Sequence, residues 1–480
     1  MSRLCRALLP HLLLILVVAC GGTSPSASRQ DGPVSPGASA GPTVPPAGSA
    51  QGSATGPGGS AAPAGSAAEP SATGPSPSST AGTGPGASAS ATPSPSVEPS
   101  ASPSSPAGTP TPGASAVPSA SPRIVRHDPA KFGFAAKGMS NEVMAFVTVG
   151  QLEYAIETMD WDVVSTVAYF SLEATREGTI ARNAGWDAWN SERMERLIDT
   201  AHEHGSKVVI SLERFSWSPG QTAASRRLLS DKARRDRLAR EVAAEVERRG
   251  ADGVNIDFEP IPSGQKKEFT DFVRAMRREL DRVRPGLQLT FCVVGHHESY
   301  DVAGATGPDA ADAVYLMGYH YAGIWSSRAG STAPMGGPAY DLVETVKSLL
   351  REVERHELIV GVPYYGHAWP TVGDRLNART EGGGFDVPVE RAFALAARHG
   401  LRYDKREQVA WVPYRAEPCD GCATRWYQLY FDDARAARFK WGWIERSNLL
   451  GTGVWTIGFE GRPGELDAAM RDVFLHGAGR

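Results

Sequence analysis

This 480-residue chain has few cysteines, no long apolar run in its main part and no strong excess of charge. The five cysteines are too few and too scattered for a fold held together by disulfides. No apolar stretch after residue 123 reaches the roughly 20 residues that cross a bilayer as a helix. The formal net charge of −4 provides no basic surface, so we expect no nucleic-acid partner.

Residues 21–121 lack aromatic side chains altogether and consist almost entirely of Ala, Gly, Pro, Ser and Thr. Such a segment has too little apolar surface to offset the entropy that is lost when a chain becomes ordered. We therefore expect a disordered tether over residues 20–122. Proline extends such a chain and Gly-Ser stretches make it flexible, so the tether is a semi-flexible spacer ahead of a folded domain at 123–480.

Residues 1–19 have the layout of an export signal, in which Arg3 and Arg6 precede an apolar run from Leu12 to Val18. The following sequence LVVAC, which ends at Cys20, resembles the lipobox of bacterial lipoproteins. This resemblance implies a lipid anchor on Cys20 and a folded domain outside the cytoplasm, in the cell envelope. The location would be the outer membrane in an organism that has one. An ordinary cleaved signal with an incidental cysteine is the alternative.

The pair Cys419 and Cys422 lies in the sequence EPCDGC and can close a tight loop by a disulfide in an oxidising compartment. A structural zinc site is the alternative, but it needs four ligands and the chain has no second cysteine pair. We favour the disulfide. Cys292 lies within an apolar, strand-like pattern, which indicates a small buried side chain.

Short apolar runs that are typical of strands alternate with amphipathic helical patterns from residue 142 onward. The helices end at recognisable residues such as Gly205, Gly250 and Pro285. Eight strands in such an alternation favour an α/β fold, a closed (β/α)8 TIM barrel. An open doubly wound sheet is the alternative, but no GxGxxG follows the first strand. The expected strands are 142–147, 164–170, 207–212, 253–258, 287–294, 313–319, 358–363 and 453–457.

The octet DGVNIDFE, residues 252–259, has an unusual pattern for a barrel strand. Both faces of such a strand are normally apolar, because one meets the helices and the other fills the barrel. Here the residues alternate: Val254, Ile256 and Phe258 on one face, and Asn255, Asp257 and Glu259 on the other. Active sites of barrels lie at the carboxyl ends of the strands, where Glu259 falls. A dry cleft and the neighbouring Asp257 would raise the pKa of Glu259, which suits a general acid. A solvated turn or a structural ion pair is the alternative.

At these residues the chain resembles glycoside hydrolase family 18, the chitinase and endo-β-N-acetylglucosaminidase family, whose fourth strand carries DGxDxDxE. Asn255 replaces the middle aspartate, a variant of the branch that cuts bacterial peptidoglycan, including spore-cortex enzymes. The sequences LIVGVPYYG at 358–366 and GVW at 453–455 resemble the seventh and eighth strands. The third strand lacks its usual Gly-Gly, and His320 replaces an aspartate after the sixth. The resemblance covers about residues 140–475 and implies a small α+β insertion at about 370–450.

The resemblance implies a retaining glycosidase for β-linked N-acetylglucosamine-containing glycans, without a cofactor. The substrate's own acetamido oxygen would be the nucleophile. Glu259 would protonate the leaving oxygen and later activate water, Asp257 would hold the acetamide N–H, and Tyr319 the acetamide oxygen. Trp455 would stack beneath the sugar. The other expected substrate-binding residues are Asn255, Met317, Tyr364, His320 and Trp217.

Two other functions compete with this hypothesis. Histidines after strands five to seven could hold zinc, but no His-x-His on the first strand supports them, and we predict no metal site. These histidines are His296, His297, His320 and His367. A non-catalytic, lectin-like surface lipoprotein is the second alternative, although Glu259 is retained. Tryptophans could line a glycan groove in either case, namely Trp217, Trp325 and Trp369. Chitin, peptidoglycan and N-linked glycans all stay open as substrates, and we expect a monomer.

Overall fold

The structure is a computed structural model that describes residues 128–461 and 464–475. The predicted signal peptide, the anchor at Cys20 and the tether at 20–122 lie outside the described residues. Within the described ranges, no helix combines the length and the apolar character that crossing a membrane requires.

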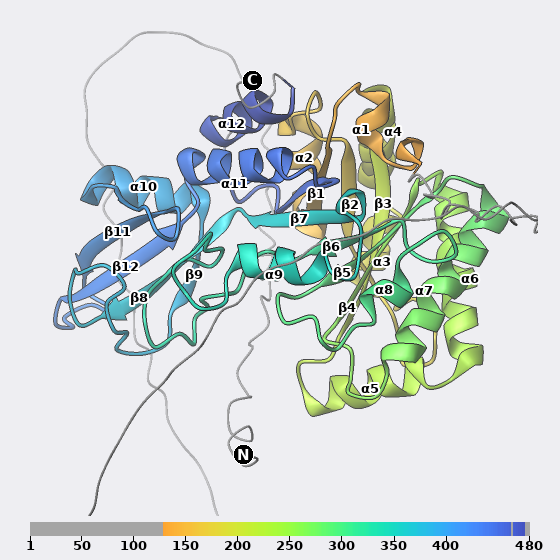
Figure 1. The fold of residues 1–480 in the computed structure, drawn as a ribbon, viewed down its shortest axis with the longest axis horizontal. Helices are drawn as coiled ribbons and strands as arrows, with labels where there is room; N and C mark the ends of the chain where they lie inside the picture. The colour runs from red at the N-terminus through yellow and green to blue at the C-terminus, as the bar shows by residue number, and fades with distance from the viewer. Residues whose placement is uncertain (1–127, 462–463, 476–480) are drawn as a thin grey trace, which may run out of the picture. The chain divides into compact units, whose positions relative to one another are not determined.

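Eight parallel strands close into a barrel in the order β1-β13-β7-β6-β5-β4-β3-β2 (Figure 1). This confirms the predicted (β/α)8 architecture. Each of the eight predicted runs contains or overlaps one barrel strand. The bounds are β1 Glu142–Thr148, β2 Thr166–Glu173, β3 Lys207–Phe215, β4 Gly253–Glu259, β5 Gln288–Val293, β6 Ala313–Leu316, β7 Leu358–Pro363 and β13 Gly451–Trp455.

The helices around the barrel follow from amphipathic sequence patterns with defined ends. The α6 helix begins after Asp231, whose carboxylate accepts hydrogen bonds from the first-turn amides, and ends at Gly250, which has a φ of 68°. The other barrel helices are α1 Gly133–Ala136, α2 Leu152–Thr158, α3 Ala184–Trp189, α4 Glu192–Glu203, α5 Pro219–Leu229, α7 Lys266–Val283, α8 Val302–Ala305, α9 Leu342–Leu349, α11 Ala434–Arg446 and α12 Glu465–Phe474. Three 3-10 turns are η1 Pro129–Lys131, η2 Val149–Gln151 and η3 Arg355–Glu357.

The barrel interior is packed around Tyr315 of β6. Its ring lies 5.1 Å from that of Phe146, measured between centroids. The Tyr315 side chain also passes close to two glycines. A Cβ at Gly361 on β7 would lie 2.5 Å from the Tyr315 hydroxyl oxygen, and a Cβ at Gly453 on β13 would lie 2.4 Å from a carbon of the Tyr315 ring. Glycine on β7 and β13 therefore makes room for a tyrosine that fills the barrel.

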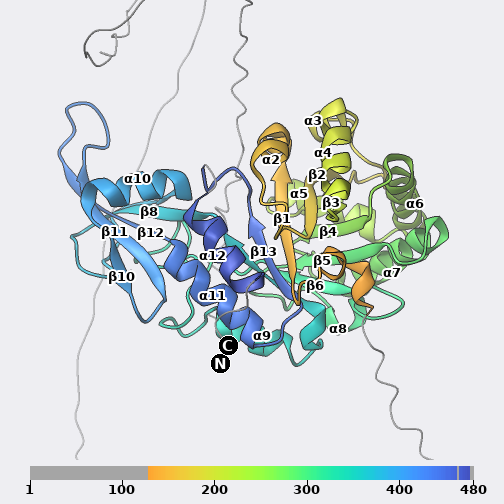
Figure 2. The ribbon, with the colours of Figure 1, turned by 90° about the horizontal axis from the view of Figure 1, so that it is seen from above.

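A second, antiparallel sheet lies beside the barrel in both views of the ribbon (Figures 1 and 2). Its strand order is β10-β11-β12-β8-β9. The bounds are β8 Tyr365–Thr371, β9 Phe385–Pro388, β10 Arg402–Asp404, β11 Val409–Ala416 and β12 Arg425–Phe431, with α10 Val389–His399 packed on it. A disulfide joins Cys419 to Cys422 between β11 and β12.

This sheet overlaps the insertion that was expected at about residues 370–450. It begins at Tyr365, immediately after β7, rather than near residue 370. It ends at Phe431, because the following α11 packs on β7, β13 and α12 as a barrel helix. The chain therefore leaves the barrel at the end of β7 and returns to it with α11, the helix that precedes the last barrel strand, β13.

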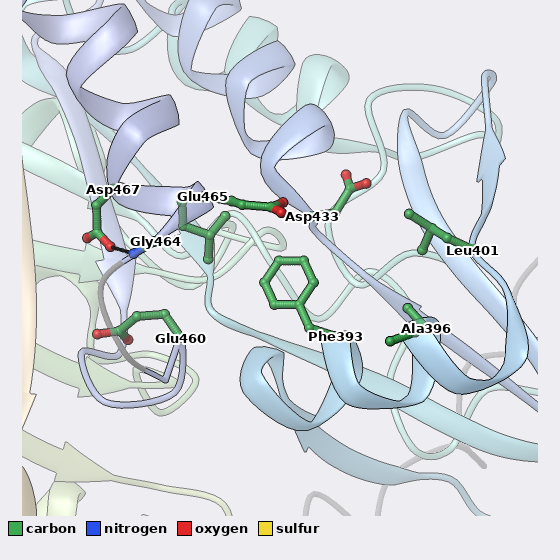
Figure 3. Close-up of a pocket in the computed structure, with 10 residues that line it drawn as sticks. Phe393, Ala396, Leu401, Asp433, Glu460, Gly464, Glu465 and Asp467 are labelled. Atoms are coloured by element: carbon green, nitrogen blue, oxygen red, sulfur yellow. Dashed lines mark hydrogen bonds between the residues drawn. The ribbon is translucent and has the colours of Figure 1, made fainter.

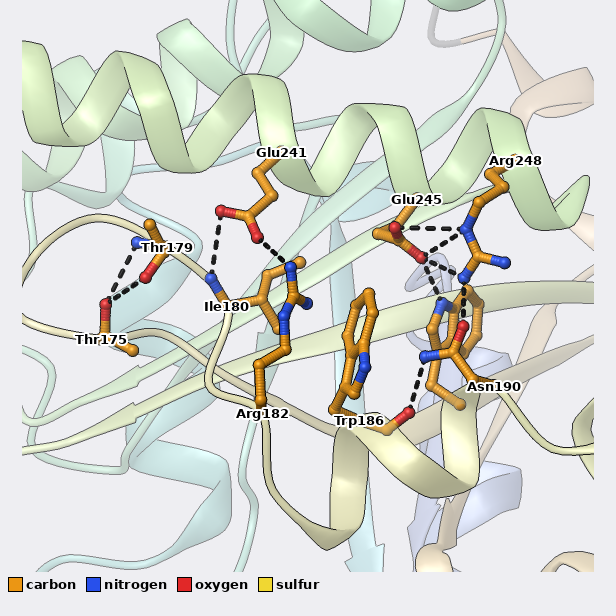
Figure 4. Close-up of polar contacts among 10 residues, drawn as sticks. Thr175, Thr179, Ile180, Arg182, Trp186, Asn190, Glu241, Glu245 and Arg248 are labelled. Atoms are coloured by element: carbon orange, nitrogen blue, oxygen red, sulfur yellow. Dashed lines mark hydrogen bonds and ion pairs between the residues drawn. The ribbon is translucent and has the colours of Figure 1, made fainter.

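The segment that follows β2 is fastened to α6 by polar contacts (Figure 4). The Glu241 carboxylate accepts hydrogen bonds from the backbone N–H of Ile180 at 3.3 Å and from Arg182 at 2.9 Å. The Arg182 guanidinium lies 3.5 Å from the centroid of the Trp186 ring. One turn further along α6, Glu245 accepts from the Trp189 indole N–H at 3.0 Å. These contacts hold the connection at the carboxyl end of β2 in place.

Candidate active site

The two faces of β4 are divided as the sequence predicts. Phe258 packs outward against α7, with its ring centroid 5.2 Å from that of Phe272. Val254 and Ile256 belong to the same apolar layer between sheet and helices. The intervening Asp257 and Glu259 point the other way and face a cavity of about 460 Å³.

This cavity lies at the carboxyl ends of the barrel strands and receives side chains from β1 to β5, β8, β9 and β13, and from the segment after β6. Its position agrees with the place where barrel enzymes carry their chemistry. Seven predicted site residues line it: Asp257, Glu259, Tyr319, Met317, His320, Trp217 and Trp455.

Two predicted substrate-binding residues, Asn255 and Tyr364, do not line the cavity. Asn255 is fully buried below it, where its side chain accepts a hydrogen bond from Thr290 at 2.8 Å and donates one to the Cys292 sulfur at 3.3 Å. Tyr364 packs in the apolar layer outside the barrel. Its neighbour Tyr365 is the tyrosine on the site side, with its ring centroid 6.0 Å from that of Tyr319.

Burial dominates the protonation of the two carboxyls on β4. It raises the pKa of Asp257 to about 7, while a hydrogen bond with Cys292 lowers that pKa in part. Burial also raises the pKa of Glu259 well above its usual range, and the charges of Asp257 and Glu213 add to this effect. A glutamate in such a position keeps its proton near neutral pH, which is what a general acid requires.

Glu213 is a functional candidate that the sequence analysis missed. It lies on β3 directly opposite Asp257 in the strand register. Burial, together with the charges of Asp257 and Glu173, raises the pKa of Glu213 to about 7. One feature of the sequence could have identified Glu213: it is a carboxyl two residues after Ser211, on the same face of a mostly apolar strand. In the sequence this segment stood out only because it lacks the Gly-Gly that is usual on the third strand of the family.

Aromatic side chains form the floor and one rim of the cavity. Trp455, at the end of β13, lies edge-on to Phe170 with 4.7 Å between ring centroids, and its ring lies 5.5 Å from that of Phe146. Trp217 and the half-exposed Trp325 line the cavity, as expected for a glycan groove. Trp369 does not: it is fully buried, and its indole N–H donates to the Gly323 carbonyl at 3.1 Å.

Three of the four candidate zinc histidines line the cavity, namely His296, His320 and His367. His297 is buried elsewhere and lies 3.3 Å from the Glu352 carboxylate. His367 lies on β8, and its Nε2 is 3.0 Å from a carboxylate oxygen of Asp386 on β9. Burial lowers the pKa of His320 to about 4. Among the described residues, no group of three or more His, Cys, Asp or Glu side chains is arranged to hold a metal ion.

A second cavity, of about 490 Å³, lies between α10 and the beginnings of α11 and α12 (Figure 3). Three of the four carboxylates that line it already have structural partners, and the fourth is that of Glu465. Asp433 accepts from the Ala436 amide at 2.9 Å, and Asp467 accepts from the Gly464 amide at 2.7 Å, so both cap helices. Glu460 accepts from the Gly458 amide at 2.8 Å. This cavity therefore has no set of uncommitted groups comparable to that on β4.

The comparisons with known proteins agree with this geometry. The family model described as "Glycosyl hydrolases family 18" matches residues 126–460. The "Cortical fragment-lytic enzyme" of Bacillus subtilis is 24% identical over 302 residues, which cover 60% of this chain and 63% of that enzyme.

Solved structures share the fold at low sequence identity. A chitinase from Chromobacterium violaceum superposes with a TM-score of 0.57 and 20% identity, covering 71% of this chain and 99% of that one. A chitinase-like agglutinin from Robinia pseudoacacia gives a TM-score of 0.59 and 16% identity, covering 69% and 99%.

Proposed function

Because the chain belongs to glycosyl hydrolases family 18, we propose that it is a retaining glycosidase for glycans with β-linked N-acetylglucosamine. The observation that carries this proposal is the pair Asp257 and Glu259, which faces one cavity from the carboxyl end of β4. The proposed nucleophile is the acetamido oxygen of the substrate itself.

The roles of the residues follow from their depth and protonation. Glu259, whose raised pKa keeps it protonated near neutral pH, donates a proton to the leaving glycosidic oxygen and then activates water. Asp257 is only 4% exposed and lies deeper on the same strand, where it accepts the acetamide N–H. Tyr319 donates to the acetamide oxygen from the far side of the cavity, and Trp455 supports the sugar ring.

The charges of the cavity favour an uncharged glycan chain of the chitin type. The three lining carboxyls are Asp257, Glu259 and Asp386, and the described lining residues include no lysine or arginine. A sugar with a free carboxylate would find no cation among the described lining residues to pair with it. Peptidoglycan is the second candidate substrate, since Asn255 matches the variant of the peptidoglycan-cutting branch.

Replacing the general acid tests the proposal. We expect wild type to release product from chito-oligosaccharides, and Glu259→Gln to lose at least about 100-fold in kcat, because proton donation contributes roughly that much. Glu203→Gln, the same change on the exposed face of α4, is the matched control and should keep wild-type activity. The first product detected by NMR should have the β configuration.

Chitin oligomers, peptidoglycan strands and glycoprotein glycans tested side by side identify the substrate class. Equal product release by wild type and Glu259→Gln would refute the catalytic assignment. Tight glycan binding by wild type without any turnover would instead support the lectin-like alternative.

A further inference from the structure

Glu213 places a third carboxyl inside the barrel, beside the two on β4. Its neighbours on β3 face outward: Leu212 packs in the apolar layer, and Arg214 donates to the Ala174 carbonyl at 3.0 Å. Because side chains alternate along a strand, Glu213 points to the interior. The register pairs Glu213 with Asp257 on the adjacent strand, and paired backbones lie about 4.8 Å apart.

Asn255 cannot serve as the partner of Asp257 on its own strand. Its amide group is engaged with Thr290 and Cys292, as described above. One oxygen of Asp257, Oδ1, is buried without a hydrogen-bond partner among the described residues. Cys292 hydrogen-bonds the Asp257 carboxylate, and the neighbouring carboxyls are those of Glu259 above it and of Glu213 on the adjacent strand.

The groups that face Glu213 are few and mostly acidic. They are Tyr169, Ser171 and Glu173 on β2, Asp257 and Glu259 on β4, and Arg214 on β3 itself. Ser171 hydrogen-bonds the Glu213 carboxyl, and Arg214 is the one cation among these groups. The Arg214 side chain leaves the strand on the opposite face, where it also donates to Ser225 at 3.2 Å. Three carboxyls thus share a water-poor space in which each ionisation makes the next more costly.

We propose that Glu213 is a positioning residue whose carboxyl, as it ionises, strengthens the hold of Glu259 on the catalytic proton. Burial raises the pKa of all three carboxyls, the charge of Glu213 raises that of Glu259 further, and the charge of Asp257 contributes to the raised pKa of Glu213. The role in catalysis rests on the proposed glycosidase function, but the effect on the proton does not.

Carbon-13 NMR of glutamate labelled at the side-chain carboxyl tests the inference without any substrate. The Glu259 resonance is assigned by its loss in Glu259→Gln. We expect Glu213→Gln to lower the pKa of Glu259 by about one unit, because a neighbouring negative charge is removed. Glu213→Asp keeps the charge and should leave that pKa within a few tenths of the wild-type value.

The matched control is Glu142→Gln, which removes another buried carboxyl. Glu142 is the first residue of β1 and lies at the amino ends of the strands, opposite the cavity. This control should leave the Glu259 titration unchanged. If Glu213→Gln does not fold, Glu213→Ala also removes the carboxyl, and the same shift is expected. An unchanged Glu259 titration in a folded variant without the carboxyl at 213 overturns the inference.

Activity provides the second readout. The alkaline limb of the kcat/KM profile of Glu213→Gln should move to lower pH by the same amount, while KM measured well below that limb stays as in wild type. If wild type hydrolyses none of the glycans, the proposed function fails, and the NMR titration still decides the role of Glu213. A fall in kcat/KM at every pH with no movement of the limb would show a merely structural role and would contradict the inference.

Discussion

Trp455 shows how a single side chain can combine a structural and a binding role. Its ring packs against Phe146 and Phe170 inside the barrel and is still part of the cavity lining. Aromatic rings offer sugars a flat apolar surface, while the neighbouring carboxyls provide polar contacts. Trp455 therefore belongs both to the lining of the cavity and to the aromatic packing inside the barrel.

We expect Trp455→Ala to weaken glycan binding about tenfold, since an aromatic contact contributes roughly 0.5–1.5 kcal/mol beyond simple burial. Isothermal titration of chitotetraose in a Glu259→Gln background measures binding without turnover. Trp426→Ala, on β12 and outside the cavity lining, is the control. An unchanged dissociation constant after Trp455→Ala would exclude the stacking role.

At the scale of the element, β4 is held in register by a glycine at its first residue. Gly253 has a φ of 155°, and a Cβ there would lie 1.9 Å from the carbonyl oxygen of Gln288 on β5. The close approach of the two strands needs a residue without a side chain. Because β4 carries Asp257 and Glu259, its register also sets the height of both carboxyls in the barrel.

Gly253→Ala should destabilise the folded domain by about 3 kcal/mol, because it combines backbone strain with a steric clash. Gly205→Ala is the matched control: Gly205 also has a positive φ, of 70°, but nothing lies within 4 Å of its Cβ position. Its cost should be about 1 kcal/mol. Urea unfolding followed by circular dichroism compares the two, and equal costs would show that the contact with Gln288 has no role.

At the scale of the whole molecule, the site joins two structural units of the chain. The barrel provides the carboxyls and the aromatic floor, and the inserted sheet adds His367 and Asp386 to the wall. The lipid anchor at Cys20 and the tether ahead of the domain stay predictions, because they lie outside the described residues.

Buried acids make stability depend on pH. Burial raises the pKa of both Glu213 and Glu460 from 4.5 to about 7, and it also raises those of Asp257, Glu259 and Glu142. The folded state then binds more protons than the unfolded state between pH 4.5 and 7, so stability falls as pH rises through this window. His320, with a pKa lowered to about 4, opposes this trend, but only below its ordinary value of 6.5.

We therefore expect the melting temperature to fall by roughly 2–4 °C or more as pH rises from 6.5, above which His320 no longer opposes the trend, through the folded-state pKa of about 7 of Glu213 and Glu460. Scanning calorimetry at several pH values measures it. Glu460→Gln, which removes one of these acids far from β4, should reduce the slope, whereas the exposed Glu203→Gln should not. A melting temperature that rises over this range would contradict the assignment of buried, protonated carboxyls.

Much of the barrel was predictable because strand and helix periods are local properties. The alternation in DGVNIDFE was enough to separate the face of Phe258 from that of Asp257 and Glu259. The alternation of side chains between two faces no longer predicts their direction where the chain passes from one sheet to another. Tyr364 was expected in the site, but β7 ends at Pro363 and β8 begins at Tyr365, so the alternation restarts and Tyr364 packs in the apolar layer outside the barrel.

The amino-acid order alone determined the strand count, the inward set on β4 and the family to which they point, because each depends on residues that are neighbours in the chain. Only the tertiary structure decided which groups meet across strands. It placed Glu213 opposite Asp257, engaged Asn255 with Thr290 and Cys292, and brought Asp386 to His367. The physical reason is that burial and charge depend on distances in space, which the closure of the barrel and the position of the inserted sheet fix.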